Sequence, residues 1–179
     1  MFFALTNALL DASIAVWEAK RHYDSPRPVT AIRALFAGQP VRACAGAFQG
    51  TQLIPGDTWQ SYLATPPFAE YVSGHSTFSA ASAEILRRFT GSDTLGAQVT
   101  IEAGASPIEP AMVPASSVTL AWPTLSAAAA EAGLSRRYGG LHFEDGDLVG
   151  REMGRQIADL VWRTAQSYFA GAPLQPAPQ

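Results

Sequence analysis

Cysteine and charge are both scarce in this chain of 179 residues. The single cysteine, Cys44, excludes an intrachain disulfide and therefore a small disulfide-held scaffold. Only 15% of the residues are charged and 47% are hydrophobic, a balance that excludes disorder over most of the length. The net charge of −3 argues against a broad basic face, so we expect no nucleic-acid partner.

Long apolar runs and histidines are also missing. No uninterrupted apolar run reaches the roughly 18 residues that a bilayer requires, so we expect no membrane span. A secretory signal is not expected either, because no basic segment precedes the first apolar stretch and Asp11 interrupts it. The chain has only three histidines, too few for a His-rich metal site.

Helical periodicity dominates the rest of the sequence. It predicts helices over residues 2–22, 31–36, 76–89, 126–132 and 144–169, and two short strands, 98–101 and 117–122, that form one small β-hairpin. Residues 38–67 are expected to be a long irregular loop. The predicted fold is mainly α, a helical bundle forming one catalytic domain over residues 1–170, with a flexible tail at 171–179.

The apolar stripes expected to face the core can be read from the same periodicity, and Ala and Ser between them predict close helix–helix contacts. In the helix predicted over residues 2–22 the stripe is Leu5, Leu9, Ile14 and Trp17. In helix 76–89 it is Phe78, Ala81, Ile85, Leu86 and Phe89. In helix 144–169 it is Val149, Met153, Ile157, Leu160, Val161 and Phe169.

Positive charge gathers at turns, although the chain has only 12 Lys and Arg residues. Lys20 and Arg27 flank the end of the first predicted helix, and Arg136 precedes His142 by six residues. Lysine supplies a point charge, whereas a guanidinium can hydrogen-bond an oxyanion through two nitrogens. His142 could bond to the central atom of that oxyanion, as a nucleophile or as a ligand.

A third group of polar residues lies at the mouth of the predicted helix 76–89. Ser73 offers a hydroxyl, and the Gly74 amide is a natural anion donor before a helix. His75 can donate or accept a proton near neutral pH. Taken singly, Ser73 reads as a helix cap and each histidine as structural, so the hypothesis depends on the three groups together.

The chain carries three short motifs in this order: Lys20-x6-Arg27-Pro28, Ser73-Gly74-His75 and Ser135-Arg136-x5-His142. Their order and spacing resemble the three-part motif of the vanadium haloperoxidase and type 2 phosphatidic acid phosphatase superfamily. The flanking residues resemble bacterial vanadium-dependent haloperoxidases over nearly the whole chain. Resemblance to this family implies vanadate as cofactor, with phosphate able to occupy the same site, and needs neither haem nor flavin.

The resemblance also implies a role for each motif residue. Lys20, Arg27, Ser73, the Gly74 amide and Arg136 would hold the equatorial oxygens of vanadate. His142 would bind vanadium axially, and His75 would act as the acid–base group. Lys20 would polarise bound peroxide, so that hydrogen peroxide oxidises halide to hypohalous acid, which then reacts with a small organic acceptor.

The same motif serves the phosphatase branch of the superfamily. There His142 would attack the phosphorus of a phosphate ester and His75 would protonate the leaving alcohol, so a soluble acid phosphatase is the alternative. Trp17 and Phe68 occupy positions that form an aromatic wall on the halide side in haloperoxidases, which favours the first function. A non-catalytic fragment that keeps the motif is a third interpretation.

Two positions depart from the family pattern. Val72 stands where proline usually precedes the serine. Gly146 stands where an aspartate usually follows the axial histidine by four residues, with Asp145 and Asp147 on either side as candidates to orient His142. The family's catalytic unit is also usually larger, so we expect a homo-oligomer or a second chain to complete the bundle.

Overall fold

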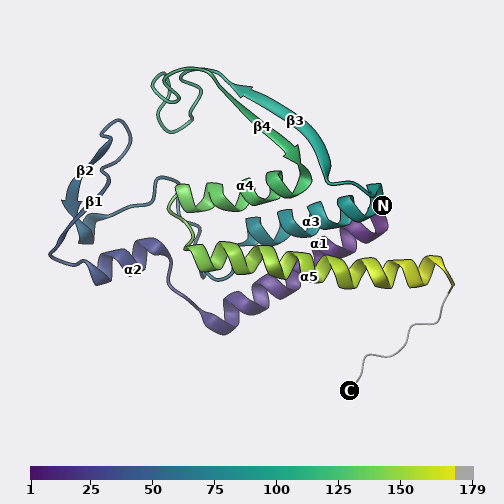
Figure 1. Ribbon diagram of the computed structural model, residues 1–179. Helices are drawn as coiled ribbons and strands as arrows, with labels where there is room; N and C mark the ends of the chain where they lie inside the picture. Colours follow the sequence, from purple (N-terminus) through teal and green to yellow (C-terminus); the bar gives the residue numbers. More distant parts are fainter. Residues whose placement is uncertain (172–179) are drawn as a thin grey trace.

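The computed structural model describes residues 1–171, and the predicted tail lies outside these residues apart from its first position. Four long helices form the bundle: α1 (Phe2–Tyr23), α3 (Gly74–Thr90), α4 (Leu125–Tyr138) and α5 (Glu144–Phe169). Helix α3 packs against the other three, as Figure 1 shows. The mainly α, helical-bundle fold predicted from the sequence is confirmed.

Shorter elements lie outside the bundle (Figure 1). Helix α2 (Pro28–Leu35) begins with its proline in the first turn, where no amide donor is needed. Strands β1 (Pro40–Cys44) and β2 (Thr51–Pro55) form one antiparallel hairpin, and β3 (Thr94–Ile101) and β4 (Val118–Thr124) form another. A 3₁₀ turn, η1 (Gly56–Thr58), follows β2.

The first hairpin corrects the prediction of an irregular loop over residues 38–67. Its register pairs Pro40 with Pro55 and Val41 with Ile54. The prolines stand at one end of the ladder, and glycines at positive φ (Gly46 and Gly50) make the turn at the other. Prolines and glycines are typical of loops, but here they lie at the ends of the two strands and do not interrupt them.

Small side chains, rather than large apolar ones, face the core of the bundle. In α1 the buried positions are every fourth residue, Ala4, Ala8, Ala12 and Val16, while the predicted Ile14 and Trp17 are 60% and 51% exposed. In α5 the predicted stripe is wrong at Val149, Leu160 and Phe169, which are exposed. The buried positions of α5 are Gly146, Asp147, Gly150, Gly154, Ala158, Val161 and Ala165. In α3, Ala81 and Ile85 are buried as predicted, but Phe89 is exposed.

Glycines bring α3 and α5 into backbone contact. A Cβ atom on Gly150 would lie 2.9 Å from the carbonyl oxygen of Ser73, and one on Gly154 would overlap the carbonyl oxygen of Thr77. Helix α4 continues past residue 132, where the sequence predicts its end, and so contains Gly133. A Cβ atom on Gly133 would overlap the carboxylate of Asp147 at the start of α5. The predicted close helix contacts are therefore present, with glycine as the main small residue.

Replacing Gly154 with alanine should destabilise the fold. The added methyl group would push α5 away from the backbone of α3, and overpacking of this kind costs about 1–3 kcal/mol. Urea unfolding followed by circular dichroism would measure the change. The control is Gln166→Ala on the exposed side of the same helix, expected to stay within about 0.5 kcal/mol of the parent. Equal stabilities for the two variants would contradict this packing account.

Large apolar side chains remain exposed on α1 and α5. They include Leu10 and Ile14 of α1 and Leu160 and Phe169 of α5. The stretch Phe2–Leu35 is long and apolar enough to cross a membrane by length and composition alone, a test that a core helix of a soluble protein also passes. The expectations of no membrane span and of an oligomer or second chain therefore both stay predictions.

Candidate active site

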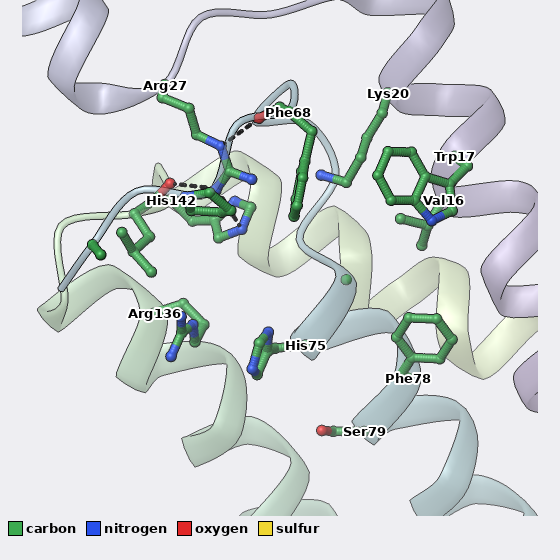
Figure 2. Close-up of a pocket in the computed structure, with 14 residues that line it drawn as sticks. Val16, Trp17, Lys20, Arg27, Phe68, His75, Phe78, Ser79, Arg136 and His142 are labelled. Carbon is green, nitrogen blue, oxygen red and sulfur yellow. Dashed lines mark hydrogen bonds between the residues drawn. The ribbon is translucent and has the colours of Figure 1, made fainter.

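A pocket of about 450 Å³ opens where the end of α1, the start of α3 and the end of α4 meet. Figure 2 shows the polar side chains pointing into it from separate elements. Its lining contains most of the residues that the motifs singled out: Trp17, Lys20, Arg27, Phe68, Gly74, His75, Arg136 and His142. Segments up to 122 positions apart in the chain (Lys20 to His142) thus form one cationic site.

Backbone carbonyls fix the two cations that come from the first motif. Lys20, in the last turn of α1, donates from Nζ to the carbonyl oxygens of Ala69 (2.9 Å) and Glu70 (3.0 Å). Arg27, the N-cap of α2, donates from Nε to the carbonyl oxygen of Phe68 (2.8 Å). Both side chains are almost completely buried, so the fold holds them rigidly.

Burial lowers the pKa of Lys20 from 10.5 to about 8, with the nearby charge of Arg27 acting in the same direction. Burial also lowers the pKa of Arg27, and the charge of Arg136 contributes. The site therefore gathers more positive charge than its own acidic group, Glu70, compensates. Such an arrangement is costly without an anion.

Two guanidinium nitrogens in the pocket have no partner among residues 1–171. They are Nη2 of Arg27 and Nε of Arg136, and both are buried. Buried donors are normally satisfied, so orphan donors in a pocket mark a place where a ligand's acceptors bind. The amides in the first turn of α3, at Gly74 and His75, also point N–H groups out of the helix end. Together these donors suit a tetrahedral oxyanion.

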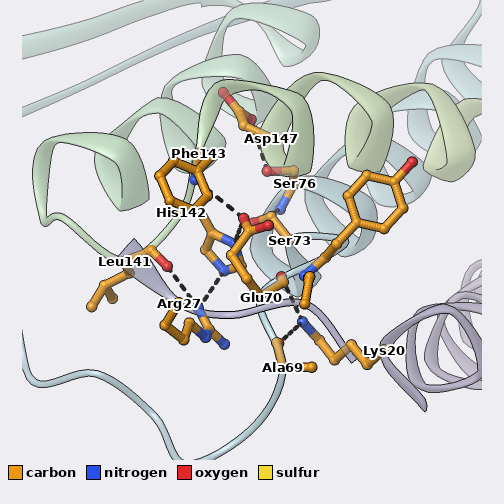
Figure 3. Close-up of polar contacts among 12 residues, drawn as sticks. Lys20, Arg27, Ala69, Glu70, Ser73, Ser76, Leu141, His142, Phe143 and Asp147 are labelled. Carbon is orange, nitrogen blue, oxygen red and sulfur yellow. Dashed lines mark hydrogen bonds and ion pairs between the residues drawn. The ribbon is translucent and has the colours of Figure 1, made fainter. Parts of the chain in front are cut away.

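His142 is held at both ring nitrogens, as Figure 3 shows. Nδ1 lies 2.6 Å from Oε1 of Glu70, and Nε2 lies 3.0 Å from Nη1 of Arg27. An ionised carboxylate at Nδ1 requires the proton there, which leaves the lone pair on Nε2. Burial is the main cause that lowers the pKa of His142, so the neutral ring is favoured at neutral pH.

His75 lies in the first turn of α3, on the other side of the pocket from Lys20 (Figure 2). Its side chain is more exposed than that of His142. Partial burial and the neighbouring charge of Arg136 lower its pKa. A neutral imidazole that reaches solvent can take a proton from water and pass it into the pocket.

Residues 1–171 match the family model of the VCPO second helical-bundle domain. The chain belongs to this family, and so to the vanadium haloperoxidases. Crystal structures of a holo-type and an apo-type bacterial vanadium-dependent chloroperoxidase are each 32% identical to it, with TM-scores of 0.85 and 0.86. These matches cover 91% of this chain and 35% and 36% of those chains.

A bacterial vanadium-dependent iodoperoxidase is more distant. It is 28% identical, with a TM-score of 0.63 over 89% of this chain and 32% of that chain. The chain thus spans about a third of the length of each of these structures. No curated protein matches the chain by sequence.

The second-bundle domain also has the aromatic wall expected at Trp17 and Phe68. Their rings meet edge to face, 5.1 Å apart. The ring of Phe68 lies between the two cations, 5.3 Å from Nζ of Lys20 and 5.0 Å from the guanidinium carbon of Arg27. Contacts of this kind are attractive and keep water from one side of each cation.

Ser73 lies behind the pocket rather than on its lining. It is fully buried and caps α3, with Oγ accepting from the Ser76 amide (3.3 Å). Its own amide donates to the carbonyl oxygen of Gly146 (2.8 Å), which joins the start of α3 to the start of α5. In this position Ser73 holds the start of α3 and does not line the pocket.

Glu70 is the site residue that the sequence reasoning missed. Of the acids considered as partners of His142, Asp147 instead accepts from Ser76 (2.8 Å) and pairs with Arg151. The only sequence signals for Glu70 were its place three residues before Ser73 and the glycine at position 146. Arg137, the neighbour of Arg136, pairs with Glu144 (2.6 Å) and stays outside the pocket lining.

Proposed function

We propose that this second-bundle domain carries the vanadate site of a haloperoxidase that uses hydrogen peroxide to oxidise halide to hypohalous acid. The observation that carries the proposal is a pair of buried donors without a partner among residues 1–171, Nη2 of Arg27 and Nε of Arg136, in the same pocket as His142, whose Nε2 lies 3.0 Å from Nη1 of Arg27. Family membership supports the same conclusion, because the related structures are vanadium-dependent peroxidases.

The proposed ligand set is the one that resemblance to the family implies, and all of its members except Ser73 line the pocket. Lys20, Arg27, Arg136, Ser73 and the Gly74 amide would hold the oxygens of vanadate, and His142 would bind the group through Nε2. Bound vanadate would supply Lewis-acid activation of peroxide. Since halide, hydrogen peroxide and one proton give hypohalous acid and water, the site must also deliver a proton.

The chain's own residues fit that proton balance. His75, with its lowered pKa and its access to solvent, would take up the proton that the reaction requires and pass it into the pocket. Lys20 would polarise bound peroxide through its Nζ, which two carbonyl oxygens hold in place. Trp17 and Phe68 would border the halide position with aromatic surface. The hypohalous acid would react with a small organic acceptor.

A phosphatase is the alternative that the same geometry supports. The neutral His142 with its lone pair on Nε2 is also a competent nucleophile towards the phosphorus of a phosphate ester. In that reaction His75 would protonate the leaving alcohol.

Two assays on one preparation separate these functions. After vanadate loading, the proposal predicts bromination of a phenol dye in the presence of bromide and hydrogen peroxide. Hydrolysis of nitrophenyl phosphate that vanadate inhibits, without any bromination by the folded loaded protein, would replace the proposal with the phosphatase.

Anion affinity should fall as the pH rises above about 8. In the free protein the pKa of Lys20 is about 8, so its ammonium is charged below that pH and mostly neutral above it. Anion binding then requires proton uptake, and linkage predicts a loss approaching tenfold per pH unit. Calorimetry with sulfate, whose own charge is constant above neutral pH, would measure the slope.

The matched variant for this pH test is Lys20→Arg, because arginine stays charged throughout the range. Above pH 8 the sulfate affinity of this variant should fall less steeply with rising pH than that of the parent. The same slope in both proteins would show that another group titrates.

A further inference from the structure

The carboxylate of Glu70 occupies the space directly beside the α-carbon of Gly146 (Figure 3 shows Glu70 with its partners). A Cβ atom built on Gly146 would overlap Oε1 of Glu70 and lie 2.9 Å from its carboxyl carbon. This space can therefore hold the carboxylate of residue 70 or a side chain from position 146, but not both. Glycine at 146 is thus a condition for the observed position of Glu70.

The carboxylate of Glu70 bonds to His142 and Phe143 rather than pairing directly with a pocket cation. Lys20 donates to the main-chain carbonyl of Glu70, and the ion pairs among residues 1–171 give the carboxylate no lysine or arginine partner within 4.0 Å. Instead Oε1 accepts from Nδ1 of His142 (2.6 Å) and from the amide of Phe143 (3.2 Å). The carboxylate of Glu70 therefore holds the segment that carries His142.

The start of α5 stabilises a negative charge at this place. Phe143 is the N-cap of α5, and its amide donates to Oε1 of Glu70 beside the positive end of the helix dipole. The side chain is 96% buried, which fixes its direction. Ser73 bonds to the carbonyl oxygen of Gly146, so the same few residues also fix the start of α3.

We propose that Glu70 is the positioning residue of His142: it sets the ring tautomer and direction, in a space that an acid at position 146 could fill instead. This inference rests on the proposed function for its consequence, oxyanion binding at Nε2. An imidazole whose Nδ1–H is held by a carboxylate presents Nε2 as a more basic ligand. Neither vanadate nor activity is needed for the tautomer itself.

The first test is the ring tautomer of ligand-free protein, read from nitrogen-15 NMR of the His142 side chain at a pH where the ring is neutral. The parent should carry its proton on Nδ1. Glu70→Ala should shift the population toward Nε2–H and weaken vanadate binding by roughly 10- to 100-fold. Glu144→Ala, an exposed acid at the same helix start, is the control and should change neither readout.

The second test is rescue from position 146. Gly146→Asp in the Glu70→Ala background should restore the Nδ1–H tautomer and recover most of the lost vanadate affinity. In the parent background the same substitution should destabilise the fold, because both carboxylates would compete for one space. Non-additivity of this kind is what a shared space predicts.

Glu70→Gln keeps the inference testable if the alanine variant fails to fold. Its amide oxygen can still accept from Nδ1, so the tautomer should persist while vanadate affinity falls several-fold with the lost charge. An unchanged tautomer and affinity in Glu70→Ala, parental affinity in Glu70→Gln, or no recovery in the folded double variant would each overturn the inference. Parent protein that shows the Nδ1–H tautomer but binds no vanadate would refute the proposed function alone.

Discussion

Replacing His142 with alanine should abolish vanadate-dependent bromination and weaken vanadate binding by more than about a hundredfold. Loss of a partner behind a metal ligand already costs 10- to 100-fold, so loss of the ligand itself should cost more. In the proposal Nε2 of His142 is the atom that binds vanadate, and it lies in the same pocket as the donors of Arg27 and Arg136 that have no partner among residues 1–171. Equilibrium dialysis with vanadate and the dye assay would measure the two effects.

The control for this variant is His22→Ala. His22 is exposed and contacts Tyr23 outside the pocket lining, so its loss should leave binding and bromination at the parental level. Bromination that survives His142→Ala would contradict the proposal that His142 binds vanadate.

Arg136→Met should weaken oxyanion binding by roughly 10- to 100-fold. The substitution removes charge-assisted hydrogen bonds, which contribute about 1.5–3 kcal/mol, and each 1.4 kcal/mol is tenfold in affinity. Stability should change in the opposite direction. Because Nε of Arg136 is buried without a partner among residues 1–171, its loss should leave the ligand-free protein as stable as the parent or more stable.

Arg137→Met is the matched control because it removes the same charge one position away. Arg137 pairs with Glu144 and stays outside the pocket lining, so oxyanion affinity should change by less than about threefold. Calorimetric titration with phosphate and thermal unfolding without it would give both quantities for each variant. Similar affinity losses in the two variants would mean that net charge, rather than a contact from Arg136, attracts the anion.

The helices were largely predictable, whereas the faces they bury were not. The last helix runs over the predicted residues 144–169, because acids at its start and an unbroken helical pattern are local signals. Its buried face is different, since Gly150 and Gly154 allow α3 to approach to backbone distance. Periodicity of large apolar residues cannot show this, and the large side chains that it selected are exposed instead.

The three motifs predicted most of the pocket, because their residue types already specify an anion site. Lys20, Arg27, His75, Arg136 and His142 meet as expected. Glu70 could not be predicted in the same way, because its contact with His142 depends on the approach of the loop before α3 to the start of α5 and on the missing side chain at Gly146. The roles of these residues in catalysis stay proposals.

The decisive measurement is a crystal structure of the protein soaked with vanadate. We expect vanadium density joined to Nε2 of His142, with vanadate oxygens bonded to the guanidinium groups of Arg27 and Arg136. A fully occupied vanadate elsewhere, or a pocket that takes up no oxyanion at saturating vanadate, would contradict it.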